Sequence, residues 1–226
     1  MIRWEREGYV VAFSTREGGV SEGPFASLNL GRLAADPSAN VDENRRRLCE
    51  AVDAEVGALA FNRQVHSTLV HRARAGGRGI EGDGLWTDEP GVPMLAFAAD
   101  CVPIAIARTD GERRLAVLHG GWRGLADGIV LEGVGAVGGE TAAVVGPAIG
   151  PCCYEVGPEV AARFDPDLTL DGRLDLWSAA ERRLREAGVA SVERVDLCTA
   201  CHPELFFSHR RDRGVTGRQG VIGALA

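Results

Sequence analysis

Four nearly continuous apolar runs in the middle of the chain constrain the fold more than any other feature. They are MLAFAA at 94–99, VPIAIA at 102–107, LAVLH at 115–119 and TAAVVG at 141–146. Runs of this length, bounded by charged residues, glycine and proline, predict strands that are buried on both faces. Such strands need a covering layer on each side, so a layered α/β fold is expected.

The flanking segments add one strand and three helices to this prediction. YVVAFS at 9–14 is typical of a strand. Asn40 followed by Glu43 resembles a capping box and predicts a helix that runs to about Val52. A second helix is expected from near Trp122 through VLEGVG, and a third over about 174–187. No repeat or long linker divides the chain, so residues 1–226 are expected to form a single domain.

The charged residues exclude several classes of function. The net charge is −7 and the sequence contains no lysine, so all 25 basic residues are arginine. This balance argues against nucleic acid or an anionic membrane as a partner, and it rules out lysine Schiff-base chemistry. No run approaches the roughly 20 apolar residues that span a bilayer, and the charged N-terminus does not resemble a signal peptide. A cytoplasmic location is therefore expected.

Three metal-binding residue types lie at the ends of apolar segments. His66 follows FNRQV, Cys101 follows MLAFAAD, and His119 ends LAVLH. Two imidazoles and one thiolate suit zinc, and three protein ligands leave the fourth position of a catalytic site open to water or substrate. Spacing alone also fits a small buried cysteine and two histidines that only make hydrogen bonds.

Several longer motifs resemble one known family from end to end. They are FSTREGGVSEGPFASLNLG, QVHS, ADCVPI, HGGWRGLADG, GPAIGPCCYEVGPEV and PELFFSHRRDRGVTGR. They are similar to the YfiH/laccase-domain family of polyphenol oxidase-like, purine nucleoside-cleaving proteins. The resemblance implies an α/β/β/α sandwich in which His66, Cys101 and His119 bind zinc. The chain departs from the usual pattern at Ser67 and in HGGWRG, and neither change alters a ligand.

The resemblance offers three activities: copper-dependent phenol oxidation, purine nucleoside phosphorolysis with adenosine deamination, and peptidoglycan editing. A multicopper centre needs more histidines than the five present, and no His-x-His pair occurs. Copper is expected only as an adventitious ion at the zinc site. The function expected is therefore a zinc-dependent purine nucleoside phosphorylase with adenosine deaminase activity. Its substrates would be phosphate and adenosine, inosine or methylthioadenosine.

Further site residues are expected within the same motifs. Phosphate must be held by arginine, backbone amides or the metal, because lysine is absent. Arg45 and Arg211 are the first choices, and Arg63 and Arg210 lie in similar motifs. Asn29, Gln64 and Asp83 are expected near ribose or base. For deamination, a zinc-activated water would attack the carbon that carries the amino group. Asp100 or Asp83 would then transfer protons, unless Asp100 instead orients a ligand histidine.

Three alternative functions stay open from the residues. Cys101 and His119 could form the catalytic pair of a cysteine hydrolase. A peptidoglycan-precursor editing enzyme is a second possibility, and a zinc-stabilised interaction module without catalysis is a third. The sequence does not specify an oligomeric state.

The remaining cysteines receive separate interpretations. Cys49 is expected in the core. Cys152 and Cys153 lie in a loop, and one of them could approach the site. CTACH at 198–202 matches the haem-attachment pattern, but the chain lacks an export signal, so Cys198 and Cys201 are interpreted as a structural or incidental pair. Among the other histidines, His209 is the one expected to line the cleft.

Overall fold

The four apolar runs form the strands predicted for them. These are β7 (Met94–Ala98), β8 (Val102–Arg108), β9 (Leu115–Gly120) and β10 (Thr141–Val145). Every residue of β9 and β10 is buried. The structure is a computed structural model that describes residues 1–32 and 35–226.

Two principal sheets contain most of the strands. In the six-stranded sheet, β13 (Ser191–Arg194), β10, β8, β9, β6 (Gly84–Thr87) and β4 (Val70–Arg72) follow one another. The four-stranded sheet has the order β1 (Ile2–Arg6), β2 (Tyr9–Phe13), β14 (Gln219–Leu225) and β7. Two small sheets pair β3 (Phe61–Arg63) with β5 (Arg78–Glu81), and β11 (Thr169–Leu170) with β12 (Arg173–Leu174). Most neighbours in the two large sheets are antiparallel.

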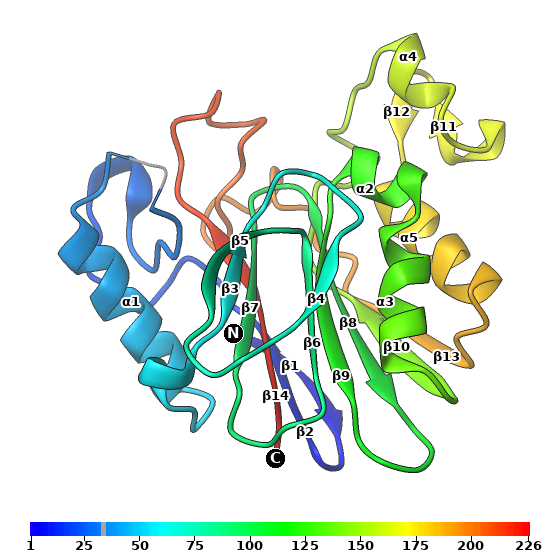
Figure 1. The fold of residues 1–226 in the computed structure, drawn as a ribbon. Helices are drawn as coiled ribbons and strands as arrows, with labels where there is room; N and C mark the ends of the chain where they lie inside the picture. The colour runs from blue at the N-terminus through cyan, green and yellow to red at the C-terminus, as the bar shows by residue number, and fades with distance from the viewer. Residues whose placement is uncertain (33–34) are drawn as a thin grey trace.

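The two large sheets pack face to face and helices cover their outer faces (Figure 1). Helix α1 (Ser38–Glu50) covers the four-stranded sheet, and α2 (Trp122–Asp127), α3 (Ile129–Val137) and α5 (Leu176–Glu186) cover the six-stranded sheet. Short elements complete the fold: α4 (Pro158–Ala161) and the 3₁₀ turns Gly23–Phe25, Val56–Ala58 and Pro166–Leu168. The apolar runs are thus buried on both faces because they lie between layers. The fold is the expected α/β/β/α arrangement.

Three apolar clusters fill the spaces between these layers. Phe13, Met94, Val117 and Val221 belong to the cluster between the sheets. Cys49 lies in the cluster under α1 and is fully buried, as predicted. In the described part of the chain, no helix has the length and apolarity to cross a membrane.

The first helix differs from its prediction at the N-terminus. It begins at Ser38 after Pro37, so Asn40 lies inside the first turn and does not cap it. The Asn40 side chain donates to Asp36 at 3.2 Å. Glu43 accepts from Arg46 and Arg47 and makes no reciprocal capping bond. The capping-box interpretation is therefore wrong, because the N-cap is Pro37, three residues before Asn40.

The second predicted helix is two helices. Gly128 has a φ of 106°, which only glycine adopts readily, and the chain turns there between α2 and α3. The third predicted helix is confirmed as α5, where Asp175 accepts from the backbone N–H of Ser178 at 3.0 Å.

Candidate metal centre

Three chain segments bring His66, Cys101 and His119 together. His66 lies in the loop after β3, Cys101 in the short connection between β7 and β8, and His119 in β9. Strands β8 and β9 are paired, with Pro103 opposite His119, so the connection before β8 lies beside the end of β9. The antiparallel register thus joins residues that are 18 positions apart in the sequence.

The distances within this cluster suit a single metal ion. One potential ligand atom from each side chain lies within 4.8 Å of the others. The Cys101 Sγ is 3.8 Å from His66 Nε2. Tetrahedral zinc, with bonds of about 2.3 Å to sulfur and 2.05 Å to nitrogen, places such atoms about 3.6 Å apart. The donor atoms therefore fit zinc in both chemistry and spacing.

Asp83 positions two members of the cluster. Its carboxylate accepts from the backbone N–H groups of Val65, His66 and Ser67, and from the Ser67 hydroxyl. It also accepts from His119 Nδ1 at 2.8 Å. The bond fixes the His119 tautomer and leaves Nε2 available to a metal. Asp83 is only 1% exposed, so it supports the cluster from the side of the protein interior.

The electrostatics of the cluster favour a cation. Burial alone would raise the pKa of Cys101, but His119 and His66 hold it well below the ordinary value of a thiol. Burial opposes the charging of His119, yet the Cys101 thiolate and Asp83 raise the pKa of this histidine. Burial would likewise raise the pKa of Asp83, but bonds from His119 and Ser67 lower it strongly. Without a metal, the Cys101 thiolate and the Asp83 carboxylate thus stabilise a charged His119, and a divalent ion would take the place of the proton on this histidine.

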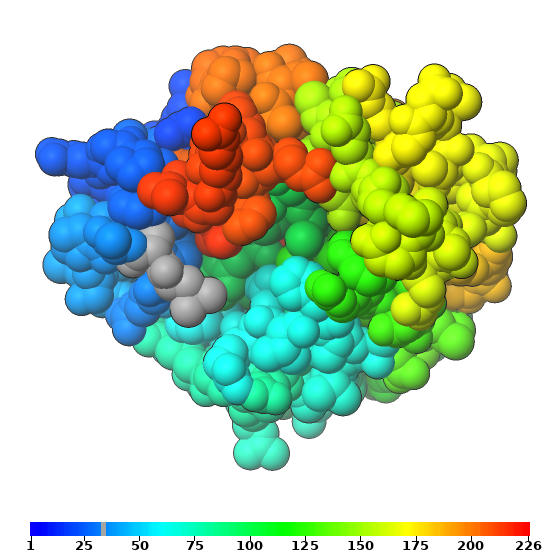
Figure 2. Space-filling model, turned by 90° about the horizontal axis from the view of Figure 1, so that it is seen from above, coloured from blue at the N-terminus to red at the C-terminus, as the bar shows by residue number. Residues whose placement is uncertain are grey.

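The cluster lies in a cleft of about 540 Å³, which is within the range of small-molecule sites. Figure 2 shows the hollow in the face that is uppermost in Figure 1, bordered by the orange-red segment that precedes β14 and the cyan segment that follows β3. The lining includes one carboxylate, from Asp100, and five arginines: Arg32, Arg45, Arg63, Arg210 and Arg218. The cleft is therefore locally positive in a chain of net charge −7. It suits an anionic ligand.

Two predicted residues line the cleft in supporting roles. Arg45 donates through Nε and Nη2 to the Leu30 carbonyl and lies over the Phe61 ring at 4.3 Å. Its burial lowers its pKa to about 10. The Gln64 amide exchanges two hydrogen bonds with the backbone of Phe97. Both side chains therefore hold the wall of the cleft.

Three other predicted residues are not among those that line the cleft, and their contact with substrate stays a prediction. Asn29 is fully buried and bonds Gly31, Asp36 and Arg218 N. Asp83 lies behind the metal cluster. Arg211 donates to Asp212 and to two backbone carbonyls. Their polar atoms are occupied by structural bonds.

Asp100, Arg63, His209 and Arg210 do line the cleft. Asp100 accepts from the Thr199 hydroxyl at 2.6 Å and from the Arg210 N–H at 2.7 Å. It makes no hydrogen bond with a histidine of the cluster within the described residues, and Asp83 has the orienting role considered for it. Arg63 pairs with Glu81 at the rim.

Arg218 and Tyr154 are among the lining residues that sequence reasoning missed. Arg218 is the last residue of the motif GVTGR, which was the available signal. Burial lowers its pKa, while Cys101 and Asp100 oppose that effect, so its charge lies near the cluster. Arg210 lies over the Tyr154 ring at 5.2 Å.

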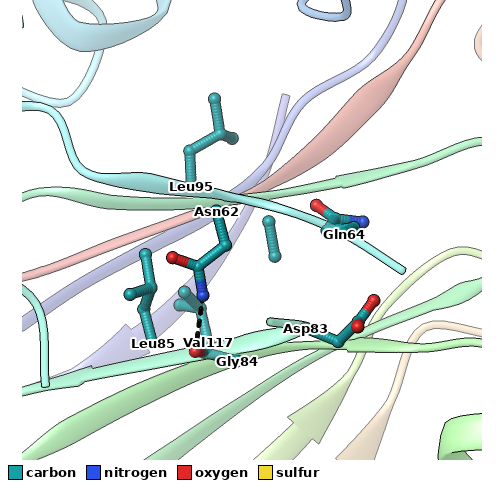
Figure 3. A pocket seen from close by; sticks show the side chains of 8 residues that line it. Asn62, Gln64, Asp83, Gly84, Leu85, Leu95 and Val117 are labelled. Atoms are coloured by element: carbon teal, nitrogen blue, oxygen red, sulfur yellow. Dashed lines mark hydrogen bonds between the residues drawn. The ribbon is translucent and has the colours of Figure 1, made fainter. Parts of the chain in front are cut away.

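A small internal cavity lies beside Asp83, between the two large sheets. Figure 3 shows Asn62 pointing to Gly84, with Asp83 and Gln64 at one end of the space. Asn62 donates to the Gly84 carbonyl at 3.0 Å and so joins β3 to β6. The volume of about 10 Å³ is at the lower limit for one water molecule, so this cavity does not bind substrate.

Gly121 leaves the space that His66 occupies. A Cβ at this position would lie 2.5 Å from His66 Cδ2 and 3.5 Å from Cys101 Sγ. Its φ of −69° is accessible to any residue, so alanine would act through contact alone. We expect Gly121→Ala to displace His66 and to weaken metal binding on the order of 10- to 100-fold. Competition with a fluorescent chelator measures this affinity.

Gly135→Ala is the matched control, because a Cβ there meets nothing within 4 Å. It should keep the metal affinity and stabilise α3 by about 0.5–1 kcal/mol. An unchanged metal affinity in Gly121→Ala would show that metal binding does not depend on the present position of His66.

The fold and the cluster define a layered α/β protein with a two-histidine, one-cysteine site in an arginine-lined cleft. Residues 10–225 match the family described as "Multi-copper polyphenol oxidoreductase laccase", and the chain belongs to this family. The family description mentions several coppers. This chain has five histidines in total, of which two are in the cluster.

The names of similar proteins give an activity that differs from the one in the family description. The "Purine nucleoside phosphorylase YlmD" of Geobacillus stearothermophilus is 39% identical over 93% of this chain and 88% of its own length. The "Purine nucleoside phosphorylase" of Haemophilus influenzae is 34% identical over 97% and 96%.

Two crystal structures have the same fold. YlmD from Geobacillus stearothermophilus aligns with a TM-score of 0.88 at 36% identity, covering 97% of this chain and 93% of that one. A protein of Neisseria meningitidis aligns with a TM-score of 0.89 at 32% identity, covering 97% and 95%.

Proposed function

We propose that this protein is a zinc-dependent purine nucleoside phosphorylase whose metal is bound by His66, Cys101 and His119. The observation that carries the proposal is a metal-suited cluster that opens into a positive cleft of nucleoside size. The names of the relatives give the reaction class. The donor set of two histidines and one thiolate favours zinc, and copper would bind the same atoms tightly as an adventitious ion.

In phosphorolysis, a phosphate oxygen forms a bond to C1′ of the ribose while the bond from C1′ to the purine nitrogen breaks. The phosphate arrives as an anion, and negative charge develops on the departing base. A zinc ion in the cluster would supply Lewis-acid stabilisation for negative charge at this end of the cleft. Arg218 and Arg210 would hold the phosphate, because both line the cleft near Asp100.

Adenosine deamination is a second candidate reaction of the same site. It replaces the amino group at C6 of the purine with oxygen from water and releases ammonia. Nucleoside deaminases use a similar zinc set of histidine and cysteine. Asp100 supports this proposal, because it is the one carboxylate among the described residues that line the cleft and could move protons to the leaving amino group.

Arg218 tests where the phosphate binds. Within the described residues, its side-chain hydrogen bonds run from Nη1 to the carbonyls of Thr216 and Gly217. We expect Arg218→Met to raise the KM for phosphate at least about 10-fold, since a charge-assisted pair is lost. Zinc content should be unchanged. Steady-state rates of adenine release from adenosine at varied phosphate measure the effect.

Arg74→Met is the control, because Arg74 is exposed and does not line the cleft. If Arg218→Met and wild type had the same KM for phosphate, the phosphate would not bind at Arg218.

The alternatives predict different behaviour. A cysteine hydrolase that uses Cys101 and His119 would work without metal and would be inhibited by zinc. An interaction module would unfold on chelation and have no turnover. A peptidoglycan-precursor editing enzyme would act on muramyl peptides in the same assay format. The proposed phosphorylase should keep its fold on chelation and lose activity reversibly.

A further inference from the structure

Four cysteines outside the cleft cluster form a second group of thiols. Cys152 and Cys153 lie in the turn after β10, and Cys198 and Cys201 lie in the segment after β13. Their four Sγ atoms are all within 4.8 Å of one another. Cys201 Sγ is 3.5 Å from Cys152 Sγ and 3.4 Å from Cys153 Sγ. The remaining cysteines, Cys49 and Cys101, lie in other parts of the fold.

The spacing of the four sulfurs matches one tetrahedral ion. Zinc–sulfur bonds are about 2.3 Å long, so the sulfurs of a tetrahedral site are about 3.8 Å apart. An iron–sulfur cluster with several irons needs more widely spaced thiolates, because each cysteine binds a different iron. Four thiolates close the coordination sphere, which is the pattern of a structural site.

We propose that Cys152, Cys153, Cys198 and Cys201 bind one zinc ion as four thiolates, at a site separate from His66, Cys101 and His119. The two sites share no residue. The proposal does not depend on the phosphorylase activity.

Backbone hydrogen bonds connect the two loops that contain these cysteines. Ala148 and Cys198 form a parallel bridge, and the Thr199 N–H donates to the Ala148 carbonyl at 3.0 Å. The Gly150 N–H points at Cys198 Sγ at 3.3 Å, as expected for a bond that supports a thiolate ligand. These contacts hold the two loops in register and leave Cys152, Cys153 and Cys201 facing one another near the surface.

The site would stabilise one wall of the cleft. Tyr154, which follows Cys153, lines the cleft. Thr199, which follows Cys198, bonds Asp100 through its hydroxyl and accepts from Arg211 at its carbonyl. A zinc ion that joins the two loops would therefore fix the segment that contains Tyr154 and the segment before Arg210.

A disulfide is the competing interpretation, because sulfurs 3.4 Å apart can form one after a small shift. A disulfide would use two of the four thiols and bind no metal. The two interpretations differ in metal count, free thiols and protein mass.

The test is the metal content of full-length protein purified under reducing, anaerobic conditions from zinc-supplemented cells. We expect two zinc ions per chain in the wild type and one in Cys101→Ala. The pair Cys152→Ser and Cys201→Ser together should also leave one zinc, with a lower melting temperature. Cys49→Ala, a buried cysteine outside both clusters, should retain two.

Cobalt substitution identifies the ligands even if the serine variant does not fold. Cys101→Ala protein loaded with Co²⁺ should bind one ion and show the intense thiolate-to-cobalt absorption of an all-sulfur site. The proposal would be overturned if Cys101→Ala protein bound no metal. It would also be overturned if the wild type bound a single zinc ion and Cys101→Ala removed it. A mass two hydrogens lower per chain, with a disulfide mapped among these four residues, would overturn it as well.

Discussion

Replacing Cys101 with alanine is expected to remove the zinc of the cleft and to lower the rate of adenosine phosphorolysis on the order of a thousandfold or more. The thiolate is one of three side chains that converge on the proposed ion. Without it, two imidazoles remain, and one of them is exposed. Elemental analysis and the adenine-release assay measure the two effects on the same sample.

The controls for this variant separate loss of metal from loss of fold. His119→Ala should have the same effects, because it removes a second ligand. His71→Gln should be close to wild type, because His71 bonds the Glu81 carbonyl and does not line the cleft. A folded Cys101→Ala protein with wild-type activity would contradict the site assignment.

Asp83→Asn is expected to have the second largest effect. The carboxylate accepts five hydrogen bonds, whereas the amide of asparagine has a single acceptor oxygen and turns its NH₂ group toward N–H donors. We expect a loss of about 2–4 kcal/mol in the free energy of unfolding. Zinc affinity should fall about 10- to 100-fold, because His119 loses its orienting partner. Chemical denaturation and chelator competition measure the two quantities.

The stability effect should depend on pH in a defined direction. The pKa of Asp83 lies well below its ordinary value, so its contribution is fully present above about pH 4. It is lost as the pH falls further toward the folded-state pKa. The difference between wild type and Asp83→Asn in the metal-free protein should thus be largest near pH 5 to 6, and it should decrease as the pH rises toward about 9, because Asp83 also stabilises the charged form of His119. A difference that disappears near neutral pH would show that Asp83 is protonated in the fold.

Asp88→Asn is the control, because Asp88 forms an exposed ion pair with Arg72. This variant should lower the free energy of unfolding by less than about 1 kcal/mol.

The layers of the fold could be predicted from the sequence because burial on both faces leaves a strong pattern. Strands β7 to β10 lie where the apolar runs are. The pairing of β7 with β14 could not be predicted, because residues 94–98 and 219–223 are joined only by tertiary packing. Gly128 shows the same limit on a smaller scale, since its left-handed conformation divides a helix whose apolar pattern continues.

The members of the candidate metal cluster could be named from their motifs, whereas the hydrogen-bond partners of each side chain could not be predicted. Asp83 was expected near substrate, yet its carboxylate lies under His119 because Gly84 pairs with Leu118 across the sheet. Arg211 was expected to bind phosphate, yet its guanidinium donates hydrogen bonds to Asp212 and to two backbone carbonyls. In an arginine-rich chain, composition does not distinguish an arginine that binds ligand from one that ties loops together. The cysteine pairs at 152–153 and 198–201 likewise give no sign in the sequence that they meet.

The most direct test of the central claim is product analysis after incubating fully zinc-loaded protein with adenosine, with and without inorganic phosphate. We expect purine base (adenine, with hypoxanthine from any deaminated substrate) and ribose 1-phosphate in equal amounts only when phosphate is present, and loss of these products on chelation. Zinc-loaded, folded protein that releases no purine base from adenosine or inosine at any phosphate concentration would contradict it.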